Sequence, residues 1–391
     1  MLRLIYLSLV AGAWMLVTGS SFASAATWSI QSTPNASGAE HSALYDIACA
    51  PGATNPCVSV GKQIDSKGKS APYVQAWNGT TWTNIAAGVP EGATAGELQS
   101  VDCAYPAEIL FCYAAGSYTS SGVTKTLIVE GGSGSMSSVK STPNPEGASE
   151  SVLKGMACKT LGQACIAVGY SVKAGKKTAL VLGQTLELKW AIQTMPEPEG
   201  AVSSELHGID CTATPFCIAV GSYVDGSGKE WAMSATWSGT SWTLKTVAKP
   251  TGEPKGSILL DVSCASSSSC TGVGGYRNSS NVQVSLVERW NGTSWSHQSS
   301  PNPVGSTNTV FQGVSCISGA LCVAVGDWFN GKWQPMAQEW TGAAWALDTT
   351  PTPVGASFSL LEGGACSATT CLASGWYTDS GGKNKTLGEK R

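Results

Sequence analysis

Fourteen cysteines are the residues of this 391-residue chain whose spacing most strongly suggests chemistry. They form seven close pairs, and the chain has no Cys-x-x-Cys motif. Zinc sites need clustered thiolates and imidazoles at closer spacing, so we expect structural disulfides and no metal. Each disulfide should join the two ends of one short hairpin. The pairs are Cys49/Cys57, Cys103/Cys112, Cys158/Cys165, Cys211/Cys217, Cys264/Cys270, Cys316/Cys322 and Cys366/Cys371.

Histidine chemistry is not expected, because the chain has only three histidines: His41, His207 and His297. They occupy different positions relative to the cysteine pairs, and none lies beside a recognisable nucleophile motif. The sequence therefore predicts neither a histidine-bound metal nor a catalytic triad. We expect no cofactor.

Arginines and glutamates offer two further kinds of chemistry. A sialidase-like site would need three converging arginines, whereas Arg277 and Arg289 lie near one predicted strand and Arg391 ends the chain. Glu130, Glu288 and Glu389 are predicted to share a strand position, where buried carboxyls could act as acids. The competing interpretation is hydrogen bonding between repeats, and we expect no catalytic residue.

Aromatic residues give the more local signal for binding. Five repeats have an aromatic residue six positions after the second cysteine, where a strand ends at the same face in every repeat. We predict that these rings form a circle that stacks on sugars or grips a peptide. Packing between neighbouring repeats is the alternative interpretation. The candidates are Tyr118, Tyr223, Tyr276, Trp328 and Tyr377.

The cysteine pairs recur about every 50 residues, which indicates an array of one supersecondary unit. Every repeat has an apolar residue five positions before the first cysteine, such as Leu44 or Phe311. Every repeat also has a glycine four positions after the second cysteine, such as Gly61 or Gly221. Four strands can be identified per repeat, with a tight Asn291-Gly292 hairpin before the last.

Seven repeats of four antiparallel strands predict an all-β, seven-bladed β-propeller. The last repeat ends after its third strand, while Trp28 lies 21 positions before Cys49, as Trp82 does before Cys103. We therefore expect residues 26–32 to supply the last strand of the seventh blade and to close the ring. Residues 26–391 should form a single domain.

The repeat resembles the kelch class of propeller. A glycine ends the second strand, an aromatic follows it and a tryptophan comes one hairpin later, but only Gly274-Gly275 keeps the kelch double glycine. The cysteine pairs are foreign to kelch repeats and resemble repeats in secreted proteins of actinobacteria. The resemblance implies the propeller fold and carries over no partner or activity.

The first residues predict export. Arg3, an apolar stretch over 4–17 and the small residues Ala23-Ser24-Ala25 are typical of a signal peptide spanning residues 1–25. An uncleaved anchor helix is the alternative. We expect a secreted, monomeric protein with no membrane span in its mature chain. A net charge of -3 argues against a nucleic-acid partner.

Two functions remain open on the sequence. The first is a secreted, non-catalytic binding propeller whose partner is an extracellular glycan or protein. The second is a propeller hydrolase or lyase that acts on extracellular carbohydrate. Because one scaffold serves many activities, the fold favours neither.

Overall fold

The computed structural model describes residues 27–50, 56–105, 109–158, 164–212, 215–252, 254–367 and 369–391. The predicted signal peptide lies outside these residues. Within them every regular element is a strand, so the predicted all-β class is confirmed. No helix in this part of the chain is long and apolar enough to span a membrane.

Antiparallel pairing joins the 28 strands in seven four-stranded units. Unit 1 contains β2 (Ala39–Cys49), β3 (Cys57–Asp65), β4 (Ser70–Trp77) and β5 (Trp82–Ala87). Unit 2 contains β6 (Ala95–Ala104), β7 (Phe111–Ser120), β8 (Val123–Gly132) and β9 (Ser135–Lys140). Unit 3 contains β10 (Ala148–Cys158), β11 (Cys165–Lys173), β12 (Lys176–Gln184) and β13 (Trp190–Ile192). Unit 4 contains β14 (Ser203–Cys211), β15 (Cys217–Val224), β16 (Glu230–Trp237) and β17 (Trp242–Lys245).

The remaining three units follow the same order, except that the N-terminal strand joins the last unit. Unit 5 contains β18 (Gly256–Ser266), β19 (Ser269–Arg277), β20 (Gln283–Trp290) and β21 (Trp295–Gln298). Unit 6 contains β22 (Asn308–Ser318), β23 (Leu321–Phe329), β24 (Trp333–Trp340) and β25 (Trp345–Leu347). Unit 7 contains β26 (Phe358–Cys366), β27 (Cys371–Thr378), β28 (Asn384–Lys390) and β1 (Ser29–Gln31).

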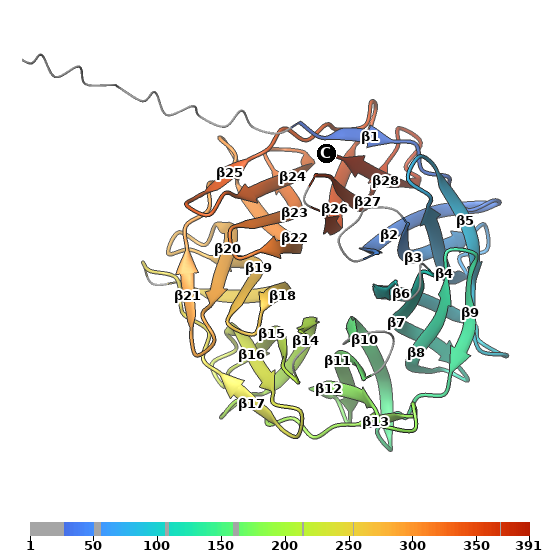
Figure 1. The fold of residues 1–391 in the computed structure, drawn as a ribbon, viewed down its shortest axis with the longest axis horizontal. Coiled ribbons are helices and arrows are strands. Elements are labelled where there is room, and N and C mark those ends of the chain that lie inside the picture. The colour runs from blue at the N-terminus through green and yellow to red at the C-terminus, as the bar shows by residue number, and fades with distance from the viewer. Residues whose placement is uncertain are drawn as a thin grey trace, which may run out of the picture.

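The units are arranged radially around a central space, with the first strand of each unit innermost (Figure 1). This radial arrangement of four-stranded antiparallel sheets is that of a β-propeller. β1 pairs with β28 through Ser29 opposite Lys390 and Gln31 opposite Gly388. The first and the last described strands therefore share one sheet.

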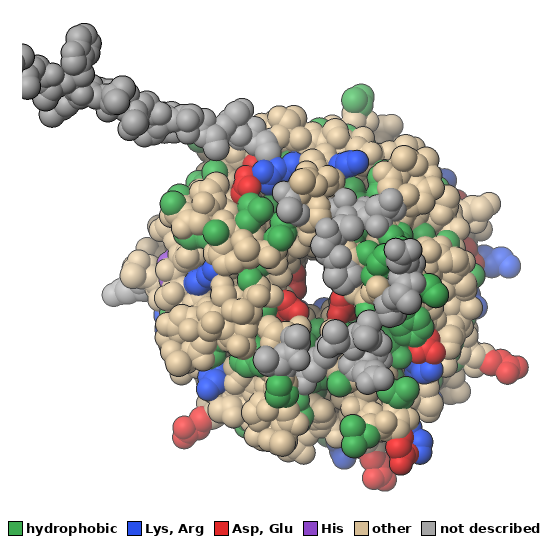
Figure 2. All heavy atoms as spheres, in the orientation of Figure 1, with side chains coloured by type: hydrophobic (Ala, Val, Ile, Leu, Met, Phe, Trp, Pro, Cys, Tyr) green, Lys and Arg blue, Asp and Glu red, His purple; other side chains and the backbone are tan. Residues whose placement is uncertain are grey.

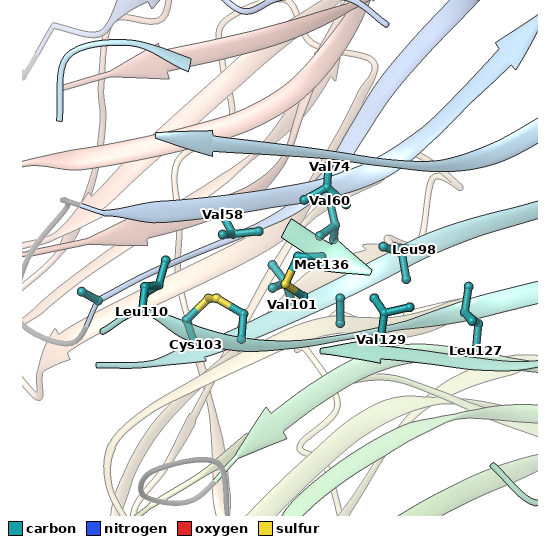
Figure 3. Packing of buried hydrophobic residues seen from close by; sticks show 13 residues of the cluster. Val58, Val60, Val74, Leu98, Val101, Cys103, Leu110, Leu127, Val129 and Met136 are labelled. Atoms are coloured by element: carbon teal, nitrogen blue, oxygen red, sulfur yellow. A yellow bond between two sulfur atoms is a disulfide. The ribbon is translucent and has the colours of Figure 1, made fainter. Parts of the chain in front are cut away.

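Hydrophobic clusters fill the spaces between neighbouring units. In the cluster of Figure 3, Val58 and Val60 of unit 1 pack with Leu98 and Val129 of unit 2. The apolar residue five positions before the first cysteine is fully buried in every unit. This register is occupied by Leu44, Leu98, Leu153, Leu206, Leu259, Phe311 and Leu361. Its apolar character is thus explained by packing between units.

The repeated glycine of the second strand is required by close backbone contact. A Cβ on Gly61 would overlap the carbonyl oxygen of Ala43, and one on Gly221 would overlap that of Glu205. In each unit the pairing of the first two strands shifts at this level, so that the residue four positions before the first cysteine bulges. The glycine and the bulge are therefore parts of one local structure.

All seven predicted disulfides are present, each within its own unit. They join the first two strands of the unit near the turn between them. Because these strands run in opposite directions, all the disulfides lie at the same end of the units. The opposite end is called the open face below. The second cysteine of every pair is buried: Cys57, Cys112, Cys165, Cys217, Cys270, Cys322 and Cys371.

The cysteines do not mark the ends of the paired strands in every unit. In unit 5, Ser266 still pairs with Ser269 beyond the disulfide, and unit 6 extends in the same way beyond Cys322. In unit 2, Ala104 pairs with Phe111 beyond the Cys112 disulfide. The predicted bonding within each hairpin is confirmed, whereas the expectation that the cysteines end the paired strands was wrong for these three units. Cys112, Cys270 and Cys322 are fully buried, which favours a structural role over a reactive one.

Candidate functional site

A cavity of about 290 Å³ lies on the central axis, lined by the first strands of all seven units. Figure 2 shows an opening at the centre of the molecule, with Asp or Glu side chains visible in its wall. Polar and charged side chains make up nearly half of the residues that line the cavity, in contrast to the apolar clusters between units. The axis is therefore a candidate site.

The bulged residues provide much of the variation around this cavity. Their register, four positions before the first cysteine, carries a different combination of groups in almost every unit. The residues are Tyr45, Gln99, Lys154, His207, Leu260, Gln312 and Glu362. We did not identify this cluster from the sequence. The available signal was a variable position directly after an invariantly apolar one.

Four aspartates of the cavity wall join neighbouring first strands. Asp46 accepts a hydrogen bond from the Val101 backbone N–H at 2.9 Å, and Asp210 accepts one from the Cys264 N–H at 2.6 Å. Asp102 and Asp261 make the same kind of bond to the next unit. Burial raises the pKa of Asp46 and Asp102 to about 6 and that of Asp210 to about 7. These carboxyls therefore act mainly as links between units.

His207 presents an unused nitrogen beside the cavity. Its Nε2 atom is buried and has no hydrogen-bond partner within the described residues, and Glu205 Oε1 is 3.9 Å away. Burial, together with the positive charge of Lys154, lowers the pKa of His207 to about 4. The imidazole is consequently neutral near pH 7 and can accept or donate one hydrogen bond.

Units 6 and 7 bring two carboxyls close to the axis. Asp327 is buried and accepts a 3.0 Å hydrogen bond from Gln312 Nε2. Glu362 accepts one of 3.3 Å from Trp376 Nε1. Burial raises the pKa of Asp327 to about 7, and burial together with the Asp327 charge raises the pKa of Glu362 to about 7. Either carboxyl can thus exist protonated at neutral pH.

The five predicted aromatic residues are all half-buried and pack against the clusters between units. Tyr118, Tyr223, Tyr276, Trp328 and Tyr377 each contact a different cluster. Three of them also line separate hollows of about 210, 260 and 240 Å³: Tyr223, Tyr276 and Trp328, respectively. The predicted register therefore combines packing with access to a cavity in these three units.

Each of the three hollows has polar groups beside its aromatic ring. Tyr223 shares its hollow with Trp231 and Lys249, whose Nζ lies 3.9 Å from the Trp231 ring centroid. Tyr276 lies with Glu230 and Gln283, and Trp328 lies with Gln334 and Thr352. A ring beside hydrogen-bonding groups is the combination that a sugar or a peptide requires.

The glutamates of the third strands do not share one register. Glu288 and Glu389 pair with the residue two positions after the cysteine, whereas Glu130 pairs with Tyr113, one position after Cys112. The sequence interpretation was wrong for Glu130, because the regular β7–β8 ladder pairs Cys112 with Gly131 and so places Glu130 one position closer to the cysteine. Glu130 forms an ion pair with Lys140 at 2.7 Å.

The three arginines within the described residues bind different partners. Arg289 donates to Thr271 Oγ1 at 2.7 Å, and Arg391 pairs with Glu339 at 2.6 Å. Arg277 donates to the Asn281 carbonyl oxygen at 3.4 Å. Within the described residues, no group of three or more His, Cys, Asp or Glu side chains could hold a metal ion.

Comparisons with known proteins support the fold alone. No family model and no curated protein matches the chain. A Dyadobacter fermentans protein of unknown function aligns with a TM-score of 0.50 at 12% identity, over 94% of this chain and 98% of that one. The fungal lectin of Aleuria aurantia, a six-bladed β-propeller with a fucose recognition mode, aligns at 0.44 and 16% identity, over 80% and 97%. Trypanosoma rangeli sialidase aligns at 0.45 and 10% identity, over 90% of this chain and 54% of that one, so this chain spans about half its length.

Proposed function

We propose that this protein is a secreted, non-catalytic propeller that binds an extracellular glycan through the hollows of its aromatic register. The observation that carries the proposal is the repeated pairing of one aromatic ring with polar side chains at Tyr223, Tyr276 and Trp328. Apolar ring faces stack on the C–H faces of sugars, while neighbouring amides, hydroxyls and charges bind their hydroxyl groups. The lectin neighbour is compatible with this function but does not establish it.

The test is a glycan array probed with the mature protein and with the Tyr223→Ala/Trp328→Ala double variant. We expect the double variant to lose binding. Tyr118→Ala is the matched control, because Tyr118 occupies the same register but lines none of the three hollows. Array binding that survives the double substitution would contradict the proposal.

Thermal denaturation separates a binding role from a packing role at the same positions. Rings that mainly face a ligand should cost little stability when removed. Rings that mainly fill space between units should cost about 3–5 kcal/mol each. A large drop in melting temperature would therefore favour the packing interpretation.

A carbohydrate hydrolase is the second candidate, favoured by one observation. Asp327 and Glu362 are two carboxyls near the axis, each with its pKa raised to about 7. A carboxyl that is protonated near neutral pH can act as a general acid at a glycosidic bond. A chromogenic glycosidase panel tests this alternative, and turnover that Glu362→Gln abolishes would support it over simple binding.

We further propose that the seven units are the blades of one closed propeller, formed by residues 26–391 and sealed by the N-terminal strand. The β1–β28 pairing supports closure. The disulfides are compatible with secretion. The kelch-like repeat, the signal peptide over 1–25 and the monomeric state remain predictions.

A further inference from the structure

Units 6 and 7 carry a continuous strip of four aromatic rings that belongs to neither the repeat nor the three hollows. Phe329 lies 5.3 Å from Trp333, measured between ring centroids, and Trp333 lies 6.1 Å from Phe358. Phe358 stacks on Trp376 with centroids 4.7 Å apart and planes 18° apart. All four side chains are half-buried. The rings form a surface at the open face that spans two units.

The strip ends at polar groups of the central cavity. Trp376 Nε1 donates to Glu362 Oε1 at 3.3 Å, and Glu362 lines the cavity together with Gln312. Gln312 Nε2 in turn donates to Asp327 Oδ1 at 3.0 Å. A molecule that lies on the strip can therefore extend its end toward the Glu362 carboxyl and the Gln312 amide, and the buried Asp327 carboxyl lies behind Gln312.

The fold does not require aromatic residues at the inner end of the strip. Phe358 lies eight residues before the first cysteine of its unit. The equivalent residues of the other units are His41, Ala95, Glu150, Ser203, Gly256 and Asn308. Position Trp376, five after the second cysteine, is occupied elsewhere by Lys62, Ser117, Tyr170, Ser222, Gly275 and Asp327. Six units pair their strands without Phe, Tyr or Trp at the first position. Packing of the repeat therefore does not explain the strip.

The strip is also separate from the proposed aromatic register. Trp328 and Phe329 are consecutive in β23, and Trp376 and Tyr377 are consecutive in β27. Because consecutive residues of a strand point to opposite faces of the sheet, the two sets of rings face different sides of each unit. A site on the strip stands whether or not the three hollows bind a glycan.

The charges at the end of the strip select among ligands. Glu362 and Asp327 form no ion pair within 4.0 Å in the part of the chain that the structure describes. The positive charge of Lys154 acts on Glu362 from beyond ion-pair distance and opposes the rise in its pKa. Four further carboxyls line the same cavity: Asp46, Asp102, Asp210 and Asp261. Carboxyl and amide groups bind sugar hydroxyls whether or not the carboxyls are ionised, whereas the fraction of these acidic groups that is ionised near pH 7 repels a ligand carboxylate.

We propose that Phe329, Trp333, Phe358 and Trp376 form a binding site for a neutral saccharide whose terminal hydroxyls bind Glu362 and Gln312. The rings supply stacking area, the acid and amide groups orient the terminal sugar, and the buried Asp327 holds Gln312 in place through its hydrogen bond. Among the described residues, only units 6 and 7 carry these four rings, whereas the hollows recur in three units.

The test measures binding of trisaccharides of glucose, mannose, galactose and N-acetylglucosamine by saturation-transfer NMR and calorimetry, with trigalacturonate as the acidic counterpart. We expect at least one neutral trisaccharide to bind and trigalacturonate to bind at least about tenfold more weakly. Trp376→Ala should weaken the neutral probe about tenfold or more, because a buried aromatic anchor typically contributes that much. Glu362→Gln, which keeps the size and one acceptor, should weaken it less.

Two controls keep the result interpretable. Phe111→Ala removes a half-buried ring at the disulfide end and should leave binding unchanged. Trp376→Phe keeps an aromatic ring for stacking but removes the hydrogen bond from Trp376 Nε1 to Glu362. It is the substitute variant to measure if Trp376→Ala fails to fold. The Tyr223→Ala/Trp328→Ala variant should still bind the trisaccharide. The proposal is overturned if no neutral trisaccharide binds or if trigalacturonate binds as tightly as the neutral probe. It is also overturned if folded Trp376→Ala and Trp333→Ala variants bind the neutral probe as tightly as the parent protein.

Discussion

Trp28 Nε1 donates a 3.1 Å hydrogen bond to Asp348 Oδ2, across 320 positions of the chain. Trp242 donates in the same way to Gln193 Oε1 at 2.8 Å, and Trp345 to Gln298 Oε1 at 3.2 Å. In each case the acceptor lies three positions after the fourth-strand tryptophan of the preceding unit. Trp28 therefore links unit 7 to the preceding unit by the same hydrogen bond that the fourth-strand tryptophans form in units 4 and 6.

Removal of residues 27–31 should destabilise the whole ring. The deletion exposes the edge of β28 and removes the Trp28 side chain, which is 2% exposed. We expect aggregation or loss of cooperative unfolding, measured by size-exclusion chromatography and calorimetry. Trp28→Ala alone should cost about 3–5 kcal/mol. Ile30→Ala is the control because Ile30 is 43% exposed, and equal melting of the deletion variant and the parent would disprove closure by this strand.

Replacement of one disulfide should lower stability without changing the fold. Cys211 and Cys217 are six positions apart, and loop-closure entropy for so short a loop corresponds to about 2 kcal/mol. We expect Cys211→Ser/Cys217→Ser to lower the unfolding free energy by about that amount in denaturant titrations. Peptide mapping without reductant should recover Cys211 linked to Cys217. A link between different units would refute the hairpin arrangement.

Stability should fall as pH rises from about 4 to 8. Burial raises the pKa of Glu389 to about 8, and both of its carboxyl oxygens lack a partner within the described residues. Burial also raises the pKa of Asp210 to about 7. These two carboxyls ionise at about pH 4 in the unfolded state but only at about pH 7 to 8 in the folded state. Between these pH values the folded state binds more protons, so the free energy of unfolding decreases as the pH rises.

Glu389→Gln isolates this effect. The variant cannot ionise, so we expect a higher melting temperature than that of the parent at pH 8 and a small difference at pH 5. Glu187→Gln is the control because Glu187 forms only an exposed ion pair with Lys189. A pH profile that the Glu389 substitution leaves unchanged would show that another group dominates.

Glycines set the distance between some first strands. A Cβ on Gly208 would lie 2.7 Å from Asp261 Cα, and one on Gly363 would lie 2.8 Å from Asp46 Cα. We expect Gly208→Ala to cost about 1–3 kcal/mol, since the neighbouring unit must shift, as measured by thermal denaturation. Gly226→Ala should be near neutral because no atom lies within 4 Å of its added Cβ. Equal stability of the two variants would contradict close packing at the axis.

Much of the fold could be predicted because each position of the repeat is seen seven times, so a pattern that is ambiguous in one unit becomes clear across all of them. A single apolar residue such as Leu259 is uninformative, but seven at one offset from cysteine indicate a buried register, and all are fully buried. Differences in register between units were not predictable in the same way. Glu130 lies one position away from the register of Glu288 and Glu389, because Cys112 pairs with Gly131 in the β7–β8 ladder, and no residue type in that segment signals this pairing.

The sequence by itself determined the period, the disulfide pairing and the joining of the two ends, because each depends on local chemistry repeated at fixed offsets. Only the tertiary structure decided which non-repeating side chains meet. Glu362, Gln312, His207 and Lys154 reach one cavity from four different units. Trp376 and Asp327 contact that group from two further strands, through Glu362 and Gln312 respectively. Such convergence depends on how the units curve around the axis, and a pattern along one chain does not record distances across the ring.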